Sequence, residues 1–349
     1  MLLGASLDPA DVLLEDGRVA AVAPFGSLSG SGDVVEAAVV APGFIDLHVH
    51  ALDGRGLVGT PDVAGLSDAL LRRGVTGFLG TTVATPVDDL VDLVSAVTAT
   101  EVGGARLLGV HLEGPWLAPP HAGAQPPTAL SLPDLASLDR LLAAGPPRML
   151  TVAPELPGAL AVIEAAARAG VVVSLGHSGA TYAEAAAAVA AGASHVTHCF
   201  NAMSPLHHRE PGLVGAALDL PGLTVELIAD GVHVHPAAAR ILLAAVGADR
   251  VCLVSDAVDI DLPGETGVTL ADGTLAGSRA GLDQAVRNLL AWGVDPVRAL
   301  TMAGATPARR LGLSELGTLQ AGMPADLVLL DDGFHVRSTV VGGEIRWQG

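Results

Sequence analysis

Between residues 43 and 293, short runs of branched apolar residues alternate with longer segments that have helical spacing. The apolar runs are GFIDLHVH, VTGFLGT, RLLGVHLEG, RMLTVAPE, VVVSLGHS, HVTHCFNAM, LTVELIADG and RVCLVSDA. Near-continuous apolar strands that alternate with amphipathic segments are typical of a parallel sheet covered by helices. Eight such units in about 250 residues have the size of a TIM barrel, and a doubly wound open sheet is the alternative. The sequence therefore favours an α/β fold with a (β/α)8 barrel over residues 44–312.

Helices are expected between most of these strands, where apolar residues recur three and four positions apart. The expected helices span residues 62–73, 87–100, 134–144, 158–169, 182–191, 236–247 and 281–293. The unit after the sixth strand is the least regular, because only the segment GLVGAALDL is available there for a short helix.

Both ends of the chain carry a different pattern, in which turn dipeptides separate short alternating apolar runs. The turn dipeptides are Asp16-Gly17, Asp332-Gly333 and Gly342-Gly343. An Asp-Gly or Gly-Gly pair between such runs is a β-hairpin signal, since both residues tolerate positive φ. We therefore expect one small β-sandwich domain that is assembled from residues 1–43 and 313–349.

Charge and composition exclude several classes of function. The formal net charge of −19 argues against nucleic acid or an anionic membrane surface as a partner. All 18 basic residues are arginine, which excludes a Schiff-base lysine, a P-loop lysine and a carbamylated lysine as a metal bridge. Cys199 and Cys252 are too few for a disulfide framework or a cysteine-type zinc site. The first residues lack a basic leader, so a cytoplasmic protein is expected.

Histidines and carboxylates recur at the carboxyl ends of the predicted strands. They are His48 and His50 after the first run, Glu113 after the third, His177 after the fifth, His198 after the sixth and Asp256 after the eighth. In a TIM barrel these strand ends form one rim, and active sites are built there. Packing alone hardly explains four histidines and two carboxylates at equivalent positions, so the pattern predicts a metal site.

Nitrogen and oxygen ligands favour zinc, iron or another divalent first-row ion. Glu113, His177 and His198 form the minimal predicted site. His48 and His50 project to the same side of their strand, so they are either a hydrogen-bonded core pair or ligands of a second ion that shares Glu113.

Asp256 is the expected general base. A bound ion lowers the pKa of its water from about 16 toward about 7, and a carboxylate nearby can take the proton and deliver it to the leaving group. The alternative role for Asp256 is to cap the loop that follows its strand. Cys199 is adjacent to His198, but strand alternation points it away from the site, which favours a buried thiol.

The motifs PGFIDLHVHALDG, HLEGPW, LGHSGAT, THCFNAM, REPGLVG, ADGVHV and LVSDA resemble those of the amidohydrolase superfamily. Within it they look like the N-acetylglucosamine-6-phosphate deacetylase family, and the resemblance covers essentially the whole chain. It implies metal-dependent hydrolysis of N-acetylglucosamine 6-phosphate to glucosamine 6-phosphate and acetate, in amino-sugar catabolism or recycling. It also implies one or two divalent ions in each subunit of a homodimer.

The resemblance implies roles for individual residues. Glu113, His177 and His198 match the principal metal ligands, and His48 and His50 match a pair that only some members keep for a second ion. Asp256 matches the catalytic acid and base, and His233 a residue that contacts and polarises the acetamide. The matches for the groups that hold the phosphate are Asn201, the backbone of Ala202, and Arg209 from the neighbouring subunit. Arginine and backbone N–H groups can hold a phosphate in a confined pocket even in an acidic protein.

The chain departs from this family after HLEGP. Gln125 stands where a histidine that contacts the sugar is expected, and His121 and Ala122 stand where two basic residues are expected. Glutamine can still hydrogen-bond a sugar hydroxyl, so Gln125 is an expected substrate contact. The departure leaves open another amidohydrolase that acts on a different N-acyl sugar or on N-acyl amino acids. Two further alternatives are an inactive barrel with a binding role, against which the complete set of ligands and Asp256 argues, and a nucleobase deaminase, against which the segment from FNAM to REPG argues.

Overall fold

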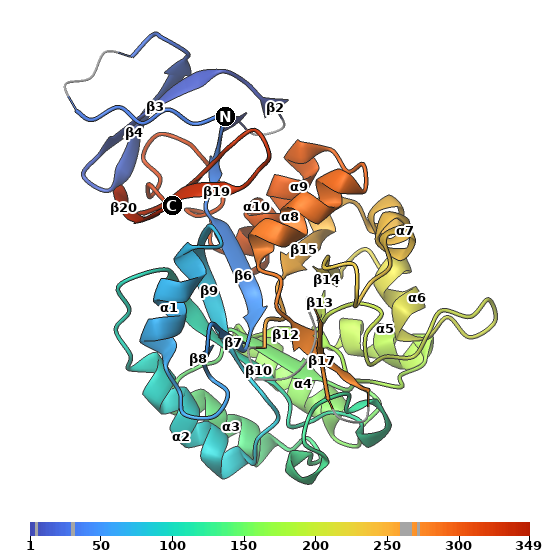
Figure 1. The fold of residues 1–349 in the computed structure, drawn as a ribbon. Helices are drawn as coiled ribbons and strands as arrows, with labels where there is room; N and C mark the ends of the chain where they lie inside the picture. Colours follow the sequence, from blue (N-terminus) through green and yellow to red (C-terminus); the bar gives the residue numbers. More distant parts are fainter. Residues whose placement is uncertain (4–5, 29–31, 259–266, 271–272) are drawn as a thin grey trace.

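A sheet of eight parallel strands organises the computed structural model, which describes residues 1–3, 6–28, 32–258, 267–270 and 273–349 (Figure 1). Each predicted apolar run contains one strand. The strands are β6 (Phe44–Val49), β9 (Val75–Thr82), β10 (Arg106–Glu113), β11 (Met149–Val152), β12 (Val172–Leu175), β13 (His195–Val196), β14 (Thr224–Ile228) and β15 (Val251–Val254). Neighbours along the chain are neighbours in the sheet, from β6 through to β15.

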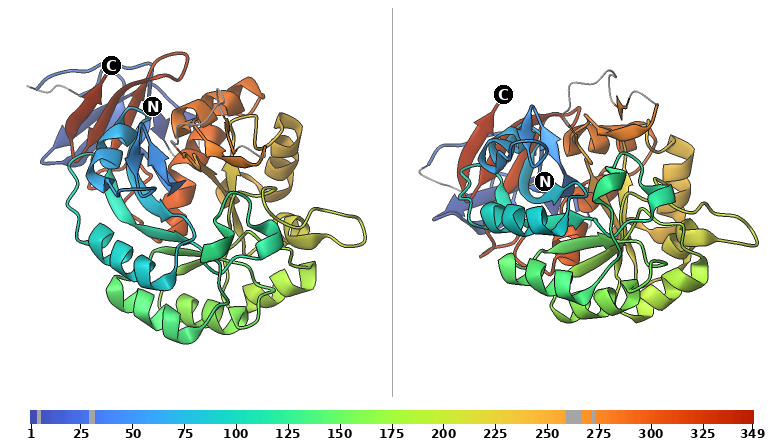
Figure 2. Two further views of the ribbon diagram at one scale, coloured as in Figure 1. Left: turned by 60° about the horizontal axis from the view of Figure 1, so that its bottom comes forward. Right: turned by 90° about the horizontal axis from the view of Figure 1, so that it is seen from below.

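The last strand returns to the first and closes the sheet. Val49 and Ala257 form a parallel bridge, and the amide of Asp256 donates to the carbonyl of His48 at 2.9 Å. A doubly wound open sheet has no such contact between its edge strands, so that alternative is excluded. The predicted (β/α)8 barrel is confirmed, and Figure 2 shows its helices on the outside of the strands.

The helices follow the predicted periodicity closely. They are α1 (Val63–Leu71), α2 (Val87–Thr98), α3 (Leu135–Ala144), α4 (Ala159–Arg168), α5 (Tyr182–Ala190), α6 (Gly212–Asp219), α7 (Pro236–Val246) and α8 (Leu282–Ala291). Local capping explains several starts: Thr181 and Glu184 form a capping box at α5, and Asp62 caps α1. Among the described residues, no helix combines the length and the apolar character that a membrane span needs.

Other elements of the described chain were not predicted. Helices α9 (Pro296–Ala303) and α10 (Ala305–Arg310) follow α8, and η1 (Pro119–His121), η2 (Pro127–Ala129) and η3 (Ala248–Arg250) are single 3₁₀ turns. Two small hairpins follow β6 and β15, respectively. They are formed by β7 (Ala51–Leu52) with β8 (Arg55–Gly56), and by β16 (Gly267–Thr269) with β17 (Leu275–Ser278).

Apolar side chains fill the barrel interior on the side of α10, away from the polar residues at the strand ends. One buried cluster comprises Ile45, Leu47, Leu79, Met149, Ile228, Cys252, Val254, Ala308 and Leu311. Its members come from β6, β9, β11, β14 and β15, with α10 and the residue after it. This packing leaves the carboxyl ends of the strands as the place where polar side chains gather.

Strands from both ends of the chain form a second sheet, as predicted. Its order is β20 (Glu344–Gln348), β19 (Val336–Val341), β18 (Leu327–Leu330) and β5 (Val39–Pro42). Beside it lies the hairpin of β3 (Ala10–Glu15) and β4 (Arg18–Pro24), and β1 (Leu2–Leu3) pairs with β2 (Ser6–Leu7). The predicted Asp16-Gly17 turn has positive φ at both residues, 49° and 75°. The domain boundaries at residues 43 and 313 stay a prediction.

A bidentate ion pair connects this terminal sheet to the barrel. Arg106 opens β10, and its Nε and Nη2 donate to the two carboxylate oxygens of Asp326 at 2.7 and 3.0 Å. The Asp326 side chain is only 6% exposed, and the Gly342 amide also donates to it, at 2.8 Å. Loss of Arg106 would therefore leave a buried carboxylate without its cation.

We expect Arg106→Ala to lower the free energy of unfolding by about 1–3 kcal/mol, because a buried charged group loses its partner. Arg168→Ala is the matched control, since Arg168 only pairs with exposed Glu164 on the surface of α4. Its cost should stay below about 0.5 kcal/mol. Urea unfolding followed by circular dichroism measures both, and equal losses would contradict this account of the connection.

Candidate active site

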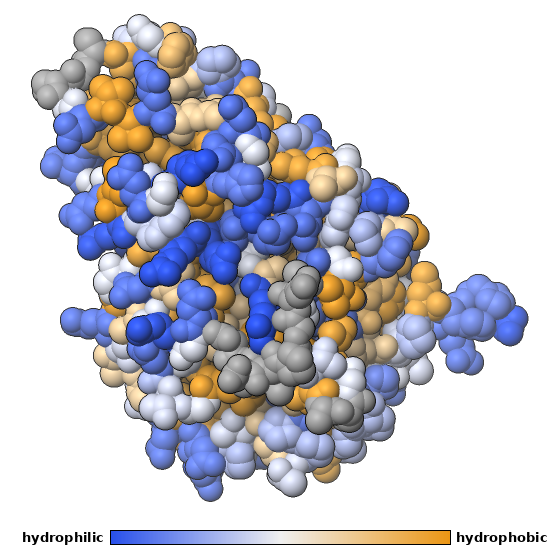
Figure 3. All heavy atoms as spheres, in the orientation of Figure 1, coloured by the Kyte–Doolittle hydropathy of each residue, from blue (hydrophilic) through white to orange (hydrophobic). Residues whose placement is uncertain are grey.

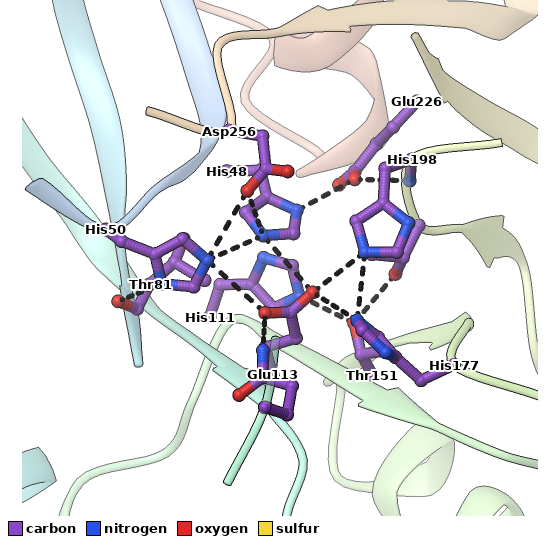
Figure 4. A network of polar contacts seen from close by, with 12 residues as sticks. His48, His50, Thr81, His111, Glu113, Thr151, His177, His198, Glu226 and Asp256 are labelled. Atoms are coloured by element: carbon purple, nitrogen blue, oxygen red, sulfur yellow. Dashed lines mark hydrogen bonds and ion pairs between the residues drawn. The ribbon is translucent and has the colours of Figure 1, made fainter. Parts of the chain in front are cut away.

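The closed barrel brings the predicted histidines and carboxylates together at its mouth (Figure 4). Each is at most 8% exposed, although their positions in the sequence span more than half of the chain. His48 lies in β6 and His50 directly follows it, Glu113 ends β10, and His177, His198 and Asp256 each come two residues after β12, β13 and β15. The strand ends thus position these side chains as the sequence predicted.

The backbone is strained where several of these residues sit. His177, His198, Ala202 and Asp256 have φ values of 48°, 26°, 48° and 46°. A non-glycine residue in this left-handed region typically costs about 1–3 kcal/mol, and such residues concentrate at functional sites. The surrounding barrel therefore holds these side chains in orientations that their local backbone preferences disfavour.

One set of ligand atoms forms a compact triangle. Oε1 of Glu113 lies 3.1 Å from Nε2 of His177 and 3.0 Å from Nε2 of His198, and the two nitrogens are 3.1 Å apart. Tetrahedral ligands at about 2.0–2.1 Å from a zinc ion are about 3.3 Å from one another. The triangle therefore has the size of one face of such a coordination sphere, with a fourth position left for water or substrate.

A second set faces the first across Glu113. Nε2 of His48 and Nε2 of His50 are 3.2 Å apart, and Oδ1 of Asp256 lies 3.3 and 3.4 Å from them. Oε2 of Glu113 is 3.3 Å from Nε2 of His50. Glu113 thus presents an oxygen to each set, as a carboxylate that bridges two ions does.

Hydrogen bonds on the outer side of three imidazoles, those of His48, His50 and His177, fix which nitrogen faces inward. Nδ1 of His48 donates to Glu226 at 3.0 Å, Nδ1 of His50 to the Thr81 carbonyl at 3.2 Å, and Nδ1 of His177 to the His121 carbonyl at 2.9 Å. Each neutral ring then presents an unprotonated Nε2 to the site. Nitrogen lone pairs and carboxylate oxygens at these distances repel one another unless a metal ion or protons lie among them, and the donor set fits a divalent metal.

The pKa values of the site reflect the same excess of acceptors. Burial alone would lower the pKa of His50, but hydrogen bonds to Asp256 and Glu113 raise it to about 9. Burial would also lower the pKa of His48. The charges of Glu113, Asp256 and Glu226 outweigh burial and raise this pKa well above its ordinary value. Without a metal ion, protons on these imidazoles would balance the carboxylates.

Beneath the ligands lies a layer of buried polar side chains that the sequence analysis missed. Glu226 lies in β14, His195 in β13 and His111 in β10. Burial lowers the pKa of His111 to about 3, and its ring bridges the Leu47 carbonyl and the Thr151 hydroxyl. Burial raises the pKa of Glu226, but His48 and His195 outweigh burial and hold it well below its usual range. An ionisable residue inside an otherwise apolar strand is the sequence signal that could have identified all three of them.

A cavity of about 320 Å³ opens above the ligands. The 3₁₀ turn η1 and the loop after it, the β17 hairpin and the segments after the strands line it. Its lining residues are His50, Glu113, Pro120, His121, Gly123, Ala124, Gln125, His177, His198, Asn201, Ala202, His233, Asp256, Thr274, Leu275, Ala276 and Gly277. Every predicted site residue is among them except His48, which is completely buried, and Arg209.

His233 is held in the cavity by a neighbour that the sequence analysis did not identify. Its Nδ1 donates to Oδ2 of Asp230 at 2.7 Å, and its amide donates to Oδ1 at 2.9 Å. Burial lowers the pKa of His233, but the hydrogen bond and charge of Asp230 outweigh burial and raise it. Asp230 therefore fixes the orientation of a ring that lines the cavity.

Gln125 has protein partners for both ends of its amide. Its nitrogen donates to Oε2 of Glu113, and its oxygen accepts from the Ala84 amide at 2.7 Å. The expected contact of Gln125 with a sugar stays a prediction. The observed contacts instead make Gln125 a support for Glu113.

Arg209 lies outside the cavity of its own subunit. It is exposed on the loop that precedes α6, where its Nη1 contacts Nε2 of His208 at 2.7 Å. This loop projects from the molecule with a hydrophilic tip (Figures 1 and 3). The role expected for Arg209 therefore requires a second copy of the chain.

Cys199 is completely buried in the apolar core, and it belongs to none of the candidate groups of metal ligands among the described residues. Burial raises the pKa of its thiol to about 12, so it stays protonated and is a poor metal ligand.

Comparisons with known proteins identify relatives over nearly the whole chain. Residues 39–346 match the model of the amidohydrolase family. The chain is 37% identical to an N-acetylgalactosamine-6-phosphate deacetylase of Escherichia coli O157:H7, covering 97% of this chain and 95% of that protein. It is 36% identical to the human N-acetylglucosamine-6-phosphate deacetylase, covering 99% of this chain and 90% of that one.

A solved structure of a relative has the same fold over nearly the whole chain. A mutant N-acetyl-D-glucosamine-6-phosphate deacetylase of Mycobacterium smegmatis, in complex with N-acetyl-D-glucosamine-6-phosphate, superimposes with a TM-score of 0.91. The sequence identity is 36%, and the match covers 97% of this chain and 95% of that chain.

The raised pKa of His50 predicts how the stability of metal-stripped protein depends on pH. Because its folded-state pKa of about 9 exceeds the ordinary 6.5, its stabilising contribution is full below pH 6.5 and is lost as the pH rises through 9. The melting temperature of stripped protein should therefore fall over this window, and zinc reconstitution or His50→Asn should flatten the fall. Differential scanning calorimetry measures it, and a stripped wild-type protein that is equally stable at both ends of the window would contradict it.

Proposed function

The chain belongs to the amidohydrolase family, and on that premise we propose that it hydrolyses N-acetylglucosamine 6-phosphate to glucosamine 6-phosphate and acetate. It is a hydrolase that acts on an amide bond. The observation that carries the proposal is the convergence of two sets of cation ligands and the carboxylate of Asp256 on one sugar-sized cavity. The reaction belongs to the breakdown or recycling of amino sugars.

The proposed cofactor is zinc or iron, with one or two ions in each subunit. Glu113, His177 and His198 would hold the first ion, and His48 and His50 would hold a second together with Glu113. Mixed imidazole and carboxylate ligands suit these metals better than calcium or magnesium. When bound, such an ion polarises an amide carbonyl and lowers the pKa of water.

Asp256 moves the proton in the proposed reaction. Burial raises its pKa, but His48, His50 and His198 outweigh burial and lower it, so Asp256 is a carboxylate at neutral pH. It can accept a proton from the attacking water and then deliver it to the departing amine nitrogen. The C–N bond breaks, the water oxygen joins the acetyl carbon, and acetate and the amine leave.

His233 orients the acetamide. Because Asp230 accepts the hydrogen bond from its Nδ1, the ring has a fixed direction in the cavity. A raised pKa favours a protonated ring, which can donate to the acetamide oxygen as negative charge develops there.

The sugar phosphate needs local positive groups, because the protein is strongly acidic. Asn201 and the backbone of Ala202 line the cavity, whereas Arg209 would reach the phosphate from the other subunit of a homodimer. Gln125 and His121 line the cavity where sugar hydroxyls would lie. The homodimer and the cytoplasmic location stay predictions.

N-acetylgalactosamine 6-phosphate is a second candidate substrate. The two sugars differ only in the orientation of one hydroxyl, and a relative named for the galactosamine substrate is 37% identical over nearly the whole chain. Gln125 departs from the histidine expected at a sugar contact, which gives this candidate a specific observation in its favour.

Acetate release from both phosphorylated sugars and from unphosphorylated N-acetylglucosamine tests the proposal. We expect a strong preference for a phosphorylated sugar, and the better of the two identifies the substrate. Asp256→Asn should lower kcat about 10²–10⁴-fold, because the proton acceptor is lost. Exposed Asp332→Asn is the control and should keep the wild-type rate. Equal rates on phosphorylated and unphosphorylated sugars would contradict the phosphate pocket, and full activity of Asp256→Asn would contradict the mechanism.

Mixed dimers test the proposed position of Arg209. Arg209→Ala should raise KM about ten- to hundredfold, because a charge-assisted hydrogen bond to the phosphate is lost. Arg168→Ala, which removes an exposed arginine of α4, is the control and should keep the wild-type KM. Co-expression of Arg209→Ala chains with Asp256→Asn chains should restore about one quarter of the wild-type activity at low substrate, since half of the dimers would contain one complete site. No restoration in purified heterodimers would show that Arg209 does not act across the interface.

A further inference from the structure

Glu226 is a buried carboxylate to which the proposed reaction assigns no role. Its side chain projects from β14 into the barrel and is completely buried. It is not among the residues that line the cavity, so it does not touch the substrate. A charged group in this position is costly unless every oxygen has a partner.

One oxygen of Glu226 contacts both sets of metal ligands. Oε2 accepts a hydrogen bond from Nδ1 of His48 at 3.0 Å and another from the backbone amide of His198 at 3.0 Å (Figure 4). His48 belongs to the set with His50, whereas His198 belongs to the set with His177. Glu226 is therefore a second link between these sets, in addition to Glu113.

The contact with His48 determines whether that ring can bind a metal. Because Nδ1 donates to Glu226, the lone pair lies on Nε2, which faces Nε2 of His50 at 3.2 Å. A carboxylate that accepts from the far nitrogen fixes the tautomer and orientation of a metal-binding histidine and makes it a better donor.

The contact with His198 supports a strained backbone. His198 has a φ of 26°, and the hydrogen bond from its amide to Glu226 helps to hold this conformation. The same conformation presents its Nε2 to Glu113 at 3.0 Å. A change at Glu226 would thus move a ligand in each set.

The other oxygen of Glu226 is held from the opposite side. Oε1 accepts from Nε2 of His195 at 3.2 Å, and Nδ1 of His195 faces the hydroxyl of Thr224 at 2.5 Å. His195 makes no contact with a metal ligand in these hydrogen bonds, so it anchors the carboxylate without touching the site.

We propose that Glu226 is a positioning residue that couples the two metal sites, by fixing the His48 ring and the His198 backbone with one carboxylate oxygen. This inference rests on the metal dependence within the proposed function. It predicts that loss of the carboxylate weakens the binding of both ions, and most strongly that of the ion bound through His48. Loss of such an outer partner typically lowers metal affinity about 10–100-fold.

The test counts and titrates metal ions without any substrate. Protein stripped with a chelator is reloaded with zinc, the bound ions are counted by mass spectrometry, and affinities are measured by competition with a chromophoric chelator. His195→Phe alone keeps the Glu226 contacts to His48 and His198, whereas His195→Phe with Glu226→Leu removes them together with the buried charge. We expect the double variant to bind its ions at least about tenfold more weakly than the single variant, which keeps both hydrogen bonds of Oε2.

Unchanged zinc affinity and stoichiometry in a folded double variant would overturn the proposal. If Glu226 only stabilised the fold, both variants would melt at a lower temperature and zinc binding would stay intact. Intact zinc binding in a folded double variant would therefore overturn the proposal. If the double variant does not fold, the similarly sized Glu226→Met decides, because a thioether is only a weak hydrogen-bond acceptor. At least about tenfold weaker zinc binding supports the proposal, and unchanged binding overturns it. Because acetate release by the wild type tests the substrate separately, failure of the proposed function and failure of this inference are distinguishable.

Discussion

The site depends on the carboxylate of Glu113, which stands between two groups of imidazole nitrogens. Its position follows from the parallel register, in which Glu113 pairs with Thr151 at the end of β10. Closure of the barrel between Val49 and Ala257 then brings His48 and Asp256 toward it from the first and last strands. An open sheet with the same strands would leave these residues apart, so the chemistry requires the closed topology.

Buried polar groups inside a barrel destabilise the fold unless they are few and each has a hydrogen-bond partner. Apolar side chains such as Leu47 and Met149 fill the barrel interior on the side of α10, and the polar layer lies toward the mouth. There, Glu226 and His111 are each hydrogen-bonded on two sides. The hydrogen bond from His48 to Glu226 also turns the His48 ring inward, so a contact that satisfies the buried charge also prepares a ligand for a metal.

The strands and most helices could be predicted because hydrophobic periodicity is a local property of the sequence. The ligands could be predicted because a barrel places strand ends on one rim, which turns sequence position into spatial proximity. Glu226 was missed because its partners come from other strands and no motif marks it. Asp230 was missed although its partner His233 lies three residues away in the quoted segment ADGVHV. The contacts of Gln125 depend on the path of a loop, and those expected of Arg209 depend on a second chain, so neither could be derived from the periodicity of this sequence.

The central claim is that Glu113 is shared by two cation sites at the barrel mouth. Anomalous diffraction from crystals of zinc-loaded protein, recorded on both sides of the zinc absorption edge, tests it most directly. We expect two peaks about 3.5–4 Å apart, one beside His177 and His198 and the other beside His48 and His50, with Glu113 bound to both. A single zinc peak in crystals saturated with zinc, zinc peaks away from Glu113, or a Glu113 carboxylate that contacts neither ion would contradict the account.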